Sequence, residues 1–179
     1  MNSTYKIIFS GPVGSGKTTA INTISDIPTI KTEASASDEI KQLKENTTVA
    51  LDYGAIILKD DTRIHLYGTP GQKRFDFMWE ILTIGGIGLL LLVDGSDKNA
   101  LDNLKFFLNS FKKFINRTSV VVGITKQDIN KRYDLSEYHA LFDKELPVIP
   151  IFEIDSRNRK DIELMVETLL YTLDPKLSF

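Results

Sequence analysis

Eight residues near the amino terminus combine glycines, a lysine and a threonine at a spacing that suits phosphate binding. The run Gly11-Pro12-Val13-Gly14-Ser15-Gly16-Lys17-Thr18 follows a short apolar segment and precedes one of helical pattern. Glycines let backbone N–H groups turn toward phosphate oxygens, and a helix amino terminus directs its partial positive charge at the same anion. Lys17 supplies a full charge and Thr18 a hydroxyl for Mg²⁺. The pattern predicts a nucleoside triphosphate site formed by Gly11, Gly14, Ser15, Gly16, Lys17, Thr18 and Thr19.

Two later polar motifs could bind the base. Thr125-Lys126-Gln127-Asp128 ends an apolar run, and Asp155-Ser156-Arg157 follows another. A carboxylate at Asp128 can accept hydrogen bonds from the ring N–H and the exocyclic amine of guanine. Adenine presents an acceptor at that edge, and an unpaired buried carboxylate can discriminate by about 10⁴ or more. We therefore predict a guanine site in which Lys126 covers the base and the second motif offers a backbone N–H, with Thr125, Lys126, Asp128, Asp155, Ser156 and Arg157 as its residues.

Short apolar runs alternate with longer segments of helical period. The predicted strands are Tyr5–Phe9, Ala55–Leu58, Arg63–Tyr67, Ile87–Val93, Val120–Thr125 and Val148–Ile154. The predicted helices are Lys17–Ser25, Phe75–Leu82, Ala100–Asn116, Ser136–Glu145 and Arg159–Leu173. Alternation of this kind favours a parallel sheet, and the short polar link at Lys59–Thr62 favours one hairpin. We expect an α/β fold with a mostly parallel six-stranded sheet, one antiparallel edge hairpin and helices on both faces.

The segment Asp26–Thr47 does not fit a compact connection. It is polar and longer than the usual link of about 4–6 residues. Two interpretations stay open, a functional loop and a solvated surface helix within Ser37–Lys44.

Composition narrows the possible classes of protein. The chain has 179 residues, which fits a single domain over 1–179, and a net charge of −2, which gives no support to sequence-independent nucleic-acid binding. It has no cysteine, which excludes disulfides, thiolate metal sites and cysteine nucleophiles. Its most apolar run, Ile84–Val93, is half of the roughly 20 residues that span a bilayer. We expect a cytoplasmic protein without a direct membrane anchor.

Taken together, the motifs resemble those of the Ras-like small GTPases. The phosphate loop, Thr48, Gly68-Thr69-Pro70-Gly71-Gln72, Thr-Lys-x-Asp and Asp155-Ser156 occur in the family's order. Within that superfamily, Thr48–Gly54 and Gly68–Gln72 are similar to the bacterial branch of the gliding-motility GTPase and of predicted GTPases that have Roadblock-type partners. The resemblance implies a P-loop NTPase fold and a GTP-binding switch, with GTP or GDP and Mg²⁺ as ligands. It also implies a Roadblock-type regulatory protein or another effector as partner.

The same resemblance implies roles for single residues. Thr48 would reach Mg²⁺ with its hydroxyl and the γ-phosphate with its backbone, as Gly71 would with its N–H, and Gln72 would orient the attacking water. Catalytic residues would then be Gln72, Lys17 and Thr48, and the metal ligands Thr18 and Thr48. We interpret part of Phe75–Trp79 as a partner surface, with core contacts for Phe75, Met78 and Trp79 as the alternative.

The chain departs from the family at two points. Gly68 stands where the family has an aspartate near Mg²⁺, and Asp52 is either its replacement or a surface strand residue. No arginine finger is evident, because Arg63 and Arg74 both have salt-bridge interpretations, and such a finger contributes about 10³–10⁵ in rate. We therefore expect slow hydrolysis of GTP without a partner. The alternative is a nucleotide-gated scaffold with little or no hydrolysis.

Overall fold

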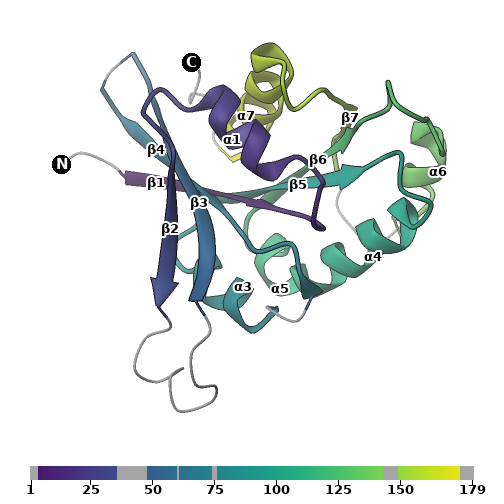
Figure 1. Cartoon of the computed structure of the whole chain (residues 1–179), viewed down its shortest axis with the longest axis horizontal. Helices are drawn as coiled ribbons and strands as arrows, with labels where there is room; N and C mark the ends of the chain where they lie inside the picture. Colours follow the sequence, from purple (N-terminus) through teal and green to yellow (C-terminus); the bar gives the residue numbers. More distant parts are fainter. Residues whose placement is uncertain (1–3, 36–47, 60, 74–75, 143–148, 174–179) are drawn as a thin grey trace.

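One mixed sheet carries the phosphate loop near its middle. The computed structural model describes residues 4–35, 48–59, 61–73, 76–142 and 149–173. The strand order across the sheet is β2-β3-β4-β1-β5-β6-β7 (Figure 1). The strands are β1 Thr4–Ser10, β2 Ile30–Ser35, β3 Thr48–Ile57, β4 Arg63–Gly68, β5 Gly88–Asp94, β6 Ser119–Thr125 and β7 Ile151–Glu153.

All pairs from β4 to β7 are parallel, whereas β3 runs antiparallel to both β2 and β4. The carboxyl ends of β4, β1, β5, β6 and β7 therefore share one edge of the sheet, which is where ligands bind in open α/β folds. The predicted motifs that follow these strands are gathered at that edge.

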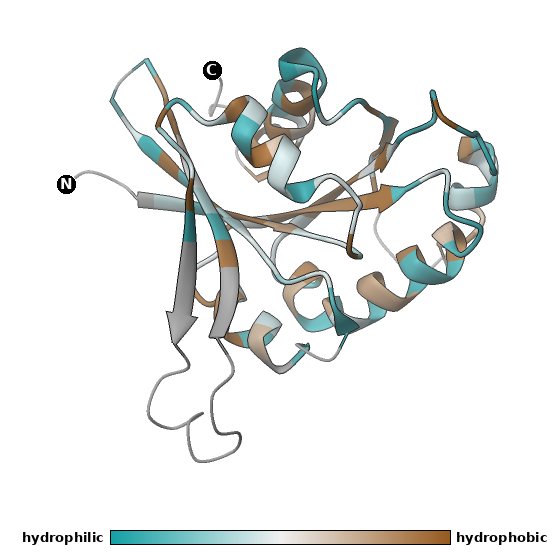
Figure 2. Cartoon of the chain, in the orientation of Figure 1, coloured by the Kyte–Doolittle hydropathy of each residue, from teal (hydrophilic) through white to brown (hydrophobic). Residues whose placement is uncertain are grey.

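Helices cover both faces of the sheet. They are α1 Lys17–Ile24, α3 Asp76–Thr83, α4 Ala100–Ser110, α5 Lys112–Ile115, α6 Leu135–His139 and α7 Arg159–Leu173. Figure 1 shows α1 and α7 on one face and α3, α4 and α5 on the other. The strand β5 is continuously apolar from Leu89 to Val93 because it is buried on both sides, with Leu90 and Leu92 in the first core and Leu89, Leu91 and Val93 in the second. Figure 2 shows this apolar centre under polar outer helix faces.

The predicted α/β class, the mostly parallel sheet, the antiparallel edge hairpin and the helices on both faces are confirmed. Within the described residues the sheet has seven strands and not six, because β2 lies inside the segment predicted without a strand and pairs with β3. The predicted helix Ala100–Asn116 is interrupted at Phe111, where φ is −95° and ψ 7°. Two predicted elements are shorter, α6 and β7, and the possible helix within Ser37–Lys44 lies outside the described residues.

Candidate functional site

The phosphate loop connects the carboxyl end of β1 to the start of α1. Gly11, Gly14 and Gly16 have φ values of 136°, 78° and 94°, in a region that residues with side chains rarely adopt. At Gly11 an added Cβ would lie 1.9 Å from the carbonyl oxygen of Leu92, so the close approach of β5 also requires glycine. The backbone therefore curls in front of the helix amino terminus, as a phosphate cradle requires.

Lys17 is a buried cation held by its own loop. Its side chain is 8% exposed, and its ammonium donates to the carbonyl oxygens of Gly11 at 2.8 Å and Pro12 at 2.7 Å. Burial lowers the pKa of Lys17 to about 8, and the negative charge of Asp52 opposes that shift. Neutral carbonyls do not compensate a full charge in a desolvated position. A polyanion bound at the loop would stabilise this ammonium.

Asp52 brings a carboxylate to the position where Gly68 has none. It lies on β3 as the antiparallel partner of Gly68 on β4, and a Cβ added to Gly68 would lie 3.3 Å from Asp52 Oδ2. The hydroxyl of Thr18 donates to this oxygen at 2.5 Å. Of the two interpretations of Asp52 from the sequence, its position favours the replacement of the missing aspartate.

The Thr18–Asp52 pair offers the oxygen donors that Mg²⁺ prefers. Within the described residues, no group of three or more His, Cys, Asp or Glu side chains could hold a metal by itself. A magnesium ion at this place would therefore need phosphate oxygens as further ligands, which is its usual mode of binding in nucleotide sites. The backbone of Thr48 pairs with Ser35 at the start of β3, and the side chain of Thr48 lies outside the described residues.

The loop after β4 lies against the phosphate loop. The buried hydroxyls of Thr69 and Ser10 share a hydrogen bond of 2.8 Å. Gly71 packs so closely that an added Cβ would lie 2.5 Å from a backbone nitrogen of the phosphate loop and 2.8 Å from Lys17 Nζ. Gln72 follows and is exposed. Gly71 and Lys17 are thus brought together, with Gln72 one residue beyond them.

The loop after β6 contacts the phosphate loop at two points. The hydroxyl of Thr125 donates to the Ser15 carbonyl at 3.1 Å, and a Cβ on Gly14 would lie 3.9 Å from Lys126 Nζ. Lys126 adopts a left-handed φ of 59°, and its ammonium pairs with Asp94 Oδ2 at 2.6 Å. Burial acts to raise the pKa of Asp94, but hydrogen bonds, first that from Lys126, lower it overall. Sequence reasoning missed Asp94, although a carboxylate at the end of a predicted strand was an available signal.

The loop after β7 is fixed to its surroundings. Ser156 is buried, its carbonyl accepts a hydrogen bond from the Thr23 hydroxyl on α1 at 2.8 Å, and a Cβ on Gly16 would lie 2.4 Å from its Oγ. Arg157 follows and pairs with Asp128 at 3.1 Å and with Asp155 at 2.7 Å. The six residues predicted for the base are therefore gathered beside the phosphate loop, on the loops after β6 and β7. Thr19 is exposed on the first turn of α1.

Two residues of the predicted partner surface are core residues. Met78 and Trp79 are 8% and 2% exposed, which agrees with the alternative of core contacts for these two. Phe75 and the side chain of Phe77 lie outside the described residues. The indole N–H of Trp79 donates to the carbonyl of Pro70 at 3.2 Å. Helix α3 is thereby tied to the loop that carries Gly71.

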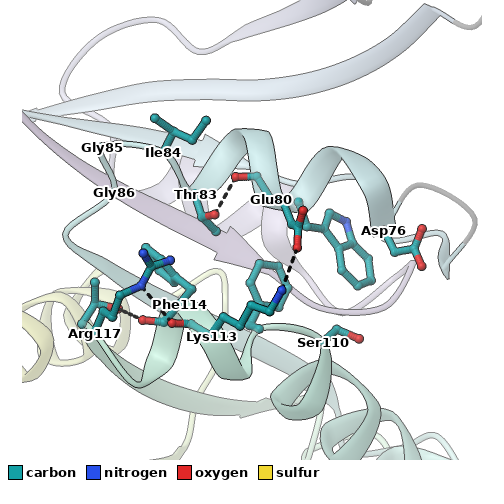
Figure 3. Close-up of a pocket in the computed structure, with 13 residues that line it drawn as sticks. Asp76, Glu80, Thr83, Ile84, Gly85, Gly86, Ser110, Lys113, Phe114 and Arg117 are labelled. Atoms are coloured by element: carbon teal, nitrogen blue, oxygen red, sulfur yellow. Dashed lines mark hydrogen bonds and ion pairs between the residues drawn. The ribbon is translucent and has the colours of Figure 1, made fainter. Parts of the chain in front are cut away.

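A groove of about 840 Å³ lies between α3 and α5 (Figure 3). Trp79, Phe111 and Phe114 contribute to its lining, and Glu80 and Lys113 face each other across it with 3.9 Å between their charged atoms. None of the residues predicted for the nucleotide lines this groove. It lies on the α3 side of the sheet.

The family comparison agrees with this geometry. A family model described as "Conserved hypothetical ATP binding protein" matches residues 9–174, which include all of the loops described above. The chain belongs to this family. In open α/β folds, ligands bind at the edge of the sheet that carries these loops. Among the helices that the structure describes, none is both long and apolar enough to cross a bilayer.

Curated relatives extend the comparison. An uncharacterized protein of Methanocaldococcus jannaschii is 32% identical over 122 residues, which cover 64% of this chain and 71% of that protein. A GTP-binding nuclear protein of Encephalitozoon cuniculi is 27% identical over 75% of this chain, and the match spans 59% of its own length. The mutual gliding-motility protein of Myxococcus xanthus is 26% identical over 79% of this chain and 77% of its own. The chain is thus a nucleotide-binding protein with a P-loop fold of the Ras-like small GTPase type.

Proposed function

We propose that this protein is a guanine-nucleotide switch that binds GTP and GDP and hydrolyses GTP slowly. The family description names ATP, whereas one relative is named as GTP-binding, so the names alone leave the base open. The observation that carries the proposal is the carboxylate of Asp128, on a loop fastened to the phosphate loop by the hydrogen bond from Thr125 to the Ser15 carbonyl, with Lys126 beside Gly14. Two N–H donors of guanine match a carboxylate, and the edge of adenine does not.

Positioning and charge would account for most of the catalysis. The backbone N–H groups of the phosphate loop and the ammonium of Lys17 would hold the phosphates, and Gly71 would add an N–H at the γ-phosphate. Gln72 would orient the attacking water, and Thr48 would close over the γ-phosphate. The close packing of Gly71 against Lys17 supports this assignment.

The residues at the loop also fit a magnesium ion. Thr18 and Thr48 would be its protein ligands, and Asp52 would supply, from β3, the carboxylate that Gly68 lacks. When bound, Mg²⁺ neutralises charge on the phosphate oxygens. The hydrogen bond from Thr18 to Asp52 holds the hydroxyl and the carboxylate side by side at the start of α1 and supports this arrangement.

A titration with guanosine and adenosine diphosphates tests the base. We expect tight binding of GDP and affinity lower by about 10⁴ or more for ADP. The variant Asp128→Asn should lose most of this preference, while the control Asp102→Asn, an exposed change on α4, should keep it. Equal affinities of the wild-type protein for the two nucleotides would remove the guanine assignment.

A second candidate is a nucleotide-gated binding module that hardly turns over. Three of the described arginines favour it, because Arg63 begins β4 at the opposite end from Gly68, while Arg157 and Arg159 are engaged by carboxylates. Arg74 lies outside the described residues. Single-turnover release of phosphate, with and without candidate partners, separates the two functions. No release under any of these conditions would favour the binding module.

The proposal includes a regulatory partner at the loop after β4. The resemblance of this chain to the bacterial gliding-motility branch points to a Roadblock-type protein as that partner. We propose that it acts on a single domain that comprises residues 1–179. The hydrogen bond between Trp79 and Pro70 supports a link from this loop to α3. A pull-down in which capture of a small Roadblock-like protein depends on GTP would test it.

A further inference from the structure

Arg157 joins the two carboxylates of the proposed base site. Its Nη2 lies 3.1 Å from Asp128 Oδ2 and 2.7 Å from Asp155 Oδ2. Its Nε lies 2.9 Å and 3.1 Å from the two oxygens of Asp155. The guanidinium thus grips Asp155 with two nitrogens and also reaches Asp128. Its planar fork suits this geometry, whereas an ammonium would act as a point charge.

One end of this bridge is anchored in the fold and the other is exposed. The backbone N–H of Arg157 donates to Asp155 Oδ1 at 2.8 Å, and that of Asp155 donates to Asp161 Oδ2 on α7, also at 2.8 Å. The residue between them, Ser156, is tied to α1, which lies beside α7 in Figure 1. The side chain of Asp128, by contrast, is 60% exposed. Arg157 therefore connects a solvated carboxylate to a fixed loop.

The bridge also keeps two like charges compensated. Asp128 and Asp155 both lie within hydrogen-bond distance of the same nitrogen, so they would repel each other without Arg157. A single exposed ion pair contributes little, but a network with bidentate arginine geometry is the recognised exception. The hydrogen bonds from Arg157 lower the pKa of Asp155, which agrees with a compensated charge.

The ion pair with Arg157 leaves lone pairs on the Asp128 carboxylate for a base. An ionised carboxylate has about four lone-pair sites. Arg157 contacts only Oδ2 of Asp128, and in the described part of the chain no further hydrogen bond to this carboxylate is present. Two donors of a base can therefore bind while the bridge stays in place.

We propose that Arg157 is a positioning residue for base recognition, which orients Asp128 toward the two N–H donors of guanine and neutralises Asp155 beside it. This inference rests on the proposed guanine-nucleotide binding. Because Arg157 acts through Asp128, its removal should affect discrimination between bases more than the hold on the phosphates.

Guanosine and inosine diphosphates provide the probe, because they differ by the exocyclic amine and have identical phosphates. In Arg157→Gln we expect the ratio of the two affinities to fall about three- to tenfold, which corresponds to the loss of one aligned hydrogen bond. Adding Asp155→Asn to this variant should recover part of the ratio, because the second charge is then absent. The control Arg159→Gln removes an equal charge that pairs with Asp26 and Glu163, and should keep the wild-type ratio.

The outcomes separate the inference from the proposed function. If the wild-type protein does not prefer GDP to ADP, the proposed function fails. If the wild type prefers GDP to both ADP and inosine diphosphate, Arg157→Gln tests the positioning role. An unchanged ratio of GDP affinity to inosine diphosphate affinity in this variant, even where both affinities fall, overturns that role. A double variant without any recovery overturns the neutralising role of Arg157.

Discussion

The ammonium of Lys17 and the carboxylate of Asp52 carry opposite charges to the same end of the phosphate loop. Lys17 is buried and hydrogen-bonded to neutral carbonyls, and Asp52 accepts a hydrogen bond from Thr18. These partners neutralise the two charges only in part, and a bound nucleotide and metal ion would neutralise them further. Nucleotide binding should therefore change the protonation of Lys17. The charge of Asp52 should in turn affect how tightly magnesium binds.

Nucleotide binding should take up protons near pH 8. The pKa of Lys17 is about 8, and bound phosphates would raise it because they favour the charged form. At pH 8 we expect an uptake of about half a proton for each GDP, and at pH 6.5 an uptake close to zero. Above pH 8 the affinity for GDP should fall, because Lys17 of the free protein loses its proton. Calorimetry in buffers of different ionisation enthalpy measures the uptake, and equal uptake at both pH values would contradict this account of Lys17.

Asp52 should control the magnesium requirement. The change Asp52→Asn keeps the shape of the side chain and removes its charge, so the Mg²⁺ concentration for half-maximal GDP retention should rise about 10-fold or more. Binding of GDP in a chelator should change far less. The control Asp61→Asn alters an exposed turn residue whose left-handed φ of 63° asparagine tolerates. If the wild type, Asp52→Asn and Asp61→Asn all retain GDP with the same magnesium midpoint, Asp52 has only a structural role in β3.

Residue types and spacing were sufficient to place the phosphate loop and the two motifs proposed for the base at the ends of strands, because each motif is local and follows an apolar run. They could not place Asp52. Its position depends on the antiparallel register that sets it opposite Gly68, and a shift of one residue would turn its side chain to the other face. Asp94 was missed for a related reason, since its partner Lys126 follows a different strand.

At the level of elements, α7 fastens the loop after β7, which we propose as part of the base site, to the sheet. Leu169 on α7 is fully buried, and a Cβ added to Gly88 on β5 would lie 2.8 Å from its methyl carbons. The change Leu169→Ala should lower the free energy of unfolding by about 2–5 kcal/mol, because it leaves a cavity. Leu164→Ala on the same helix alters a side chain that is 45% exposed and should cost within about 0.5 kcal/mol. Denaturant titrations of the nucleotide-free proteins compare the two, and equal losses would contradict this packing.

The strands and helices differ in how clearly the sequence predicts them. Central strands such as β5 are buried on both faces and appear as continuous apolar runs. The edge strand β2 reads Ile-Lys-Thr-Glu-Ala-Ser, without such a run, and becomes a strand through its pairing with β3. The break between α4 and α5 was also not visible, because buried apolar residues continue on both sides of it.

At the level of the whole molecule, the nucleotide edge and the groove beside α3 are joined by one tryptophan. Trp79 lines the groove, donates to Pro70 and is the sole tryptophan of the chain. Replacing GDP with a non-hydrolysable GTP analogue should therefore change the intrinsic fluorescence, because Gly71 would move with its neighbour Pro70. Trp79→Phe provides the baseline without an indole. Identical emission spectra in the two nucleotide states would show that α3 does not follow the loop.

The placement of Asp52 on β3 has a mechanical consequence. Thr48 and Asp52 stand four residues apart on one strand, and β2 is hydrogen-bonded along that strand. A force that slides β3 along its neighbour β4 would displace both groups proposed to surround the metal, while the phosphate loop between β1 and α1 stays in place. We therefore expect that another molecule that pulls on β2 and β3 would weaken binding of the proposed magnesium ion from a distance.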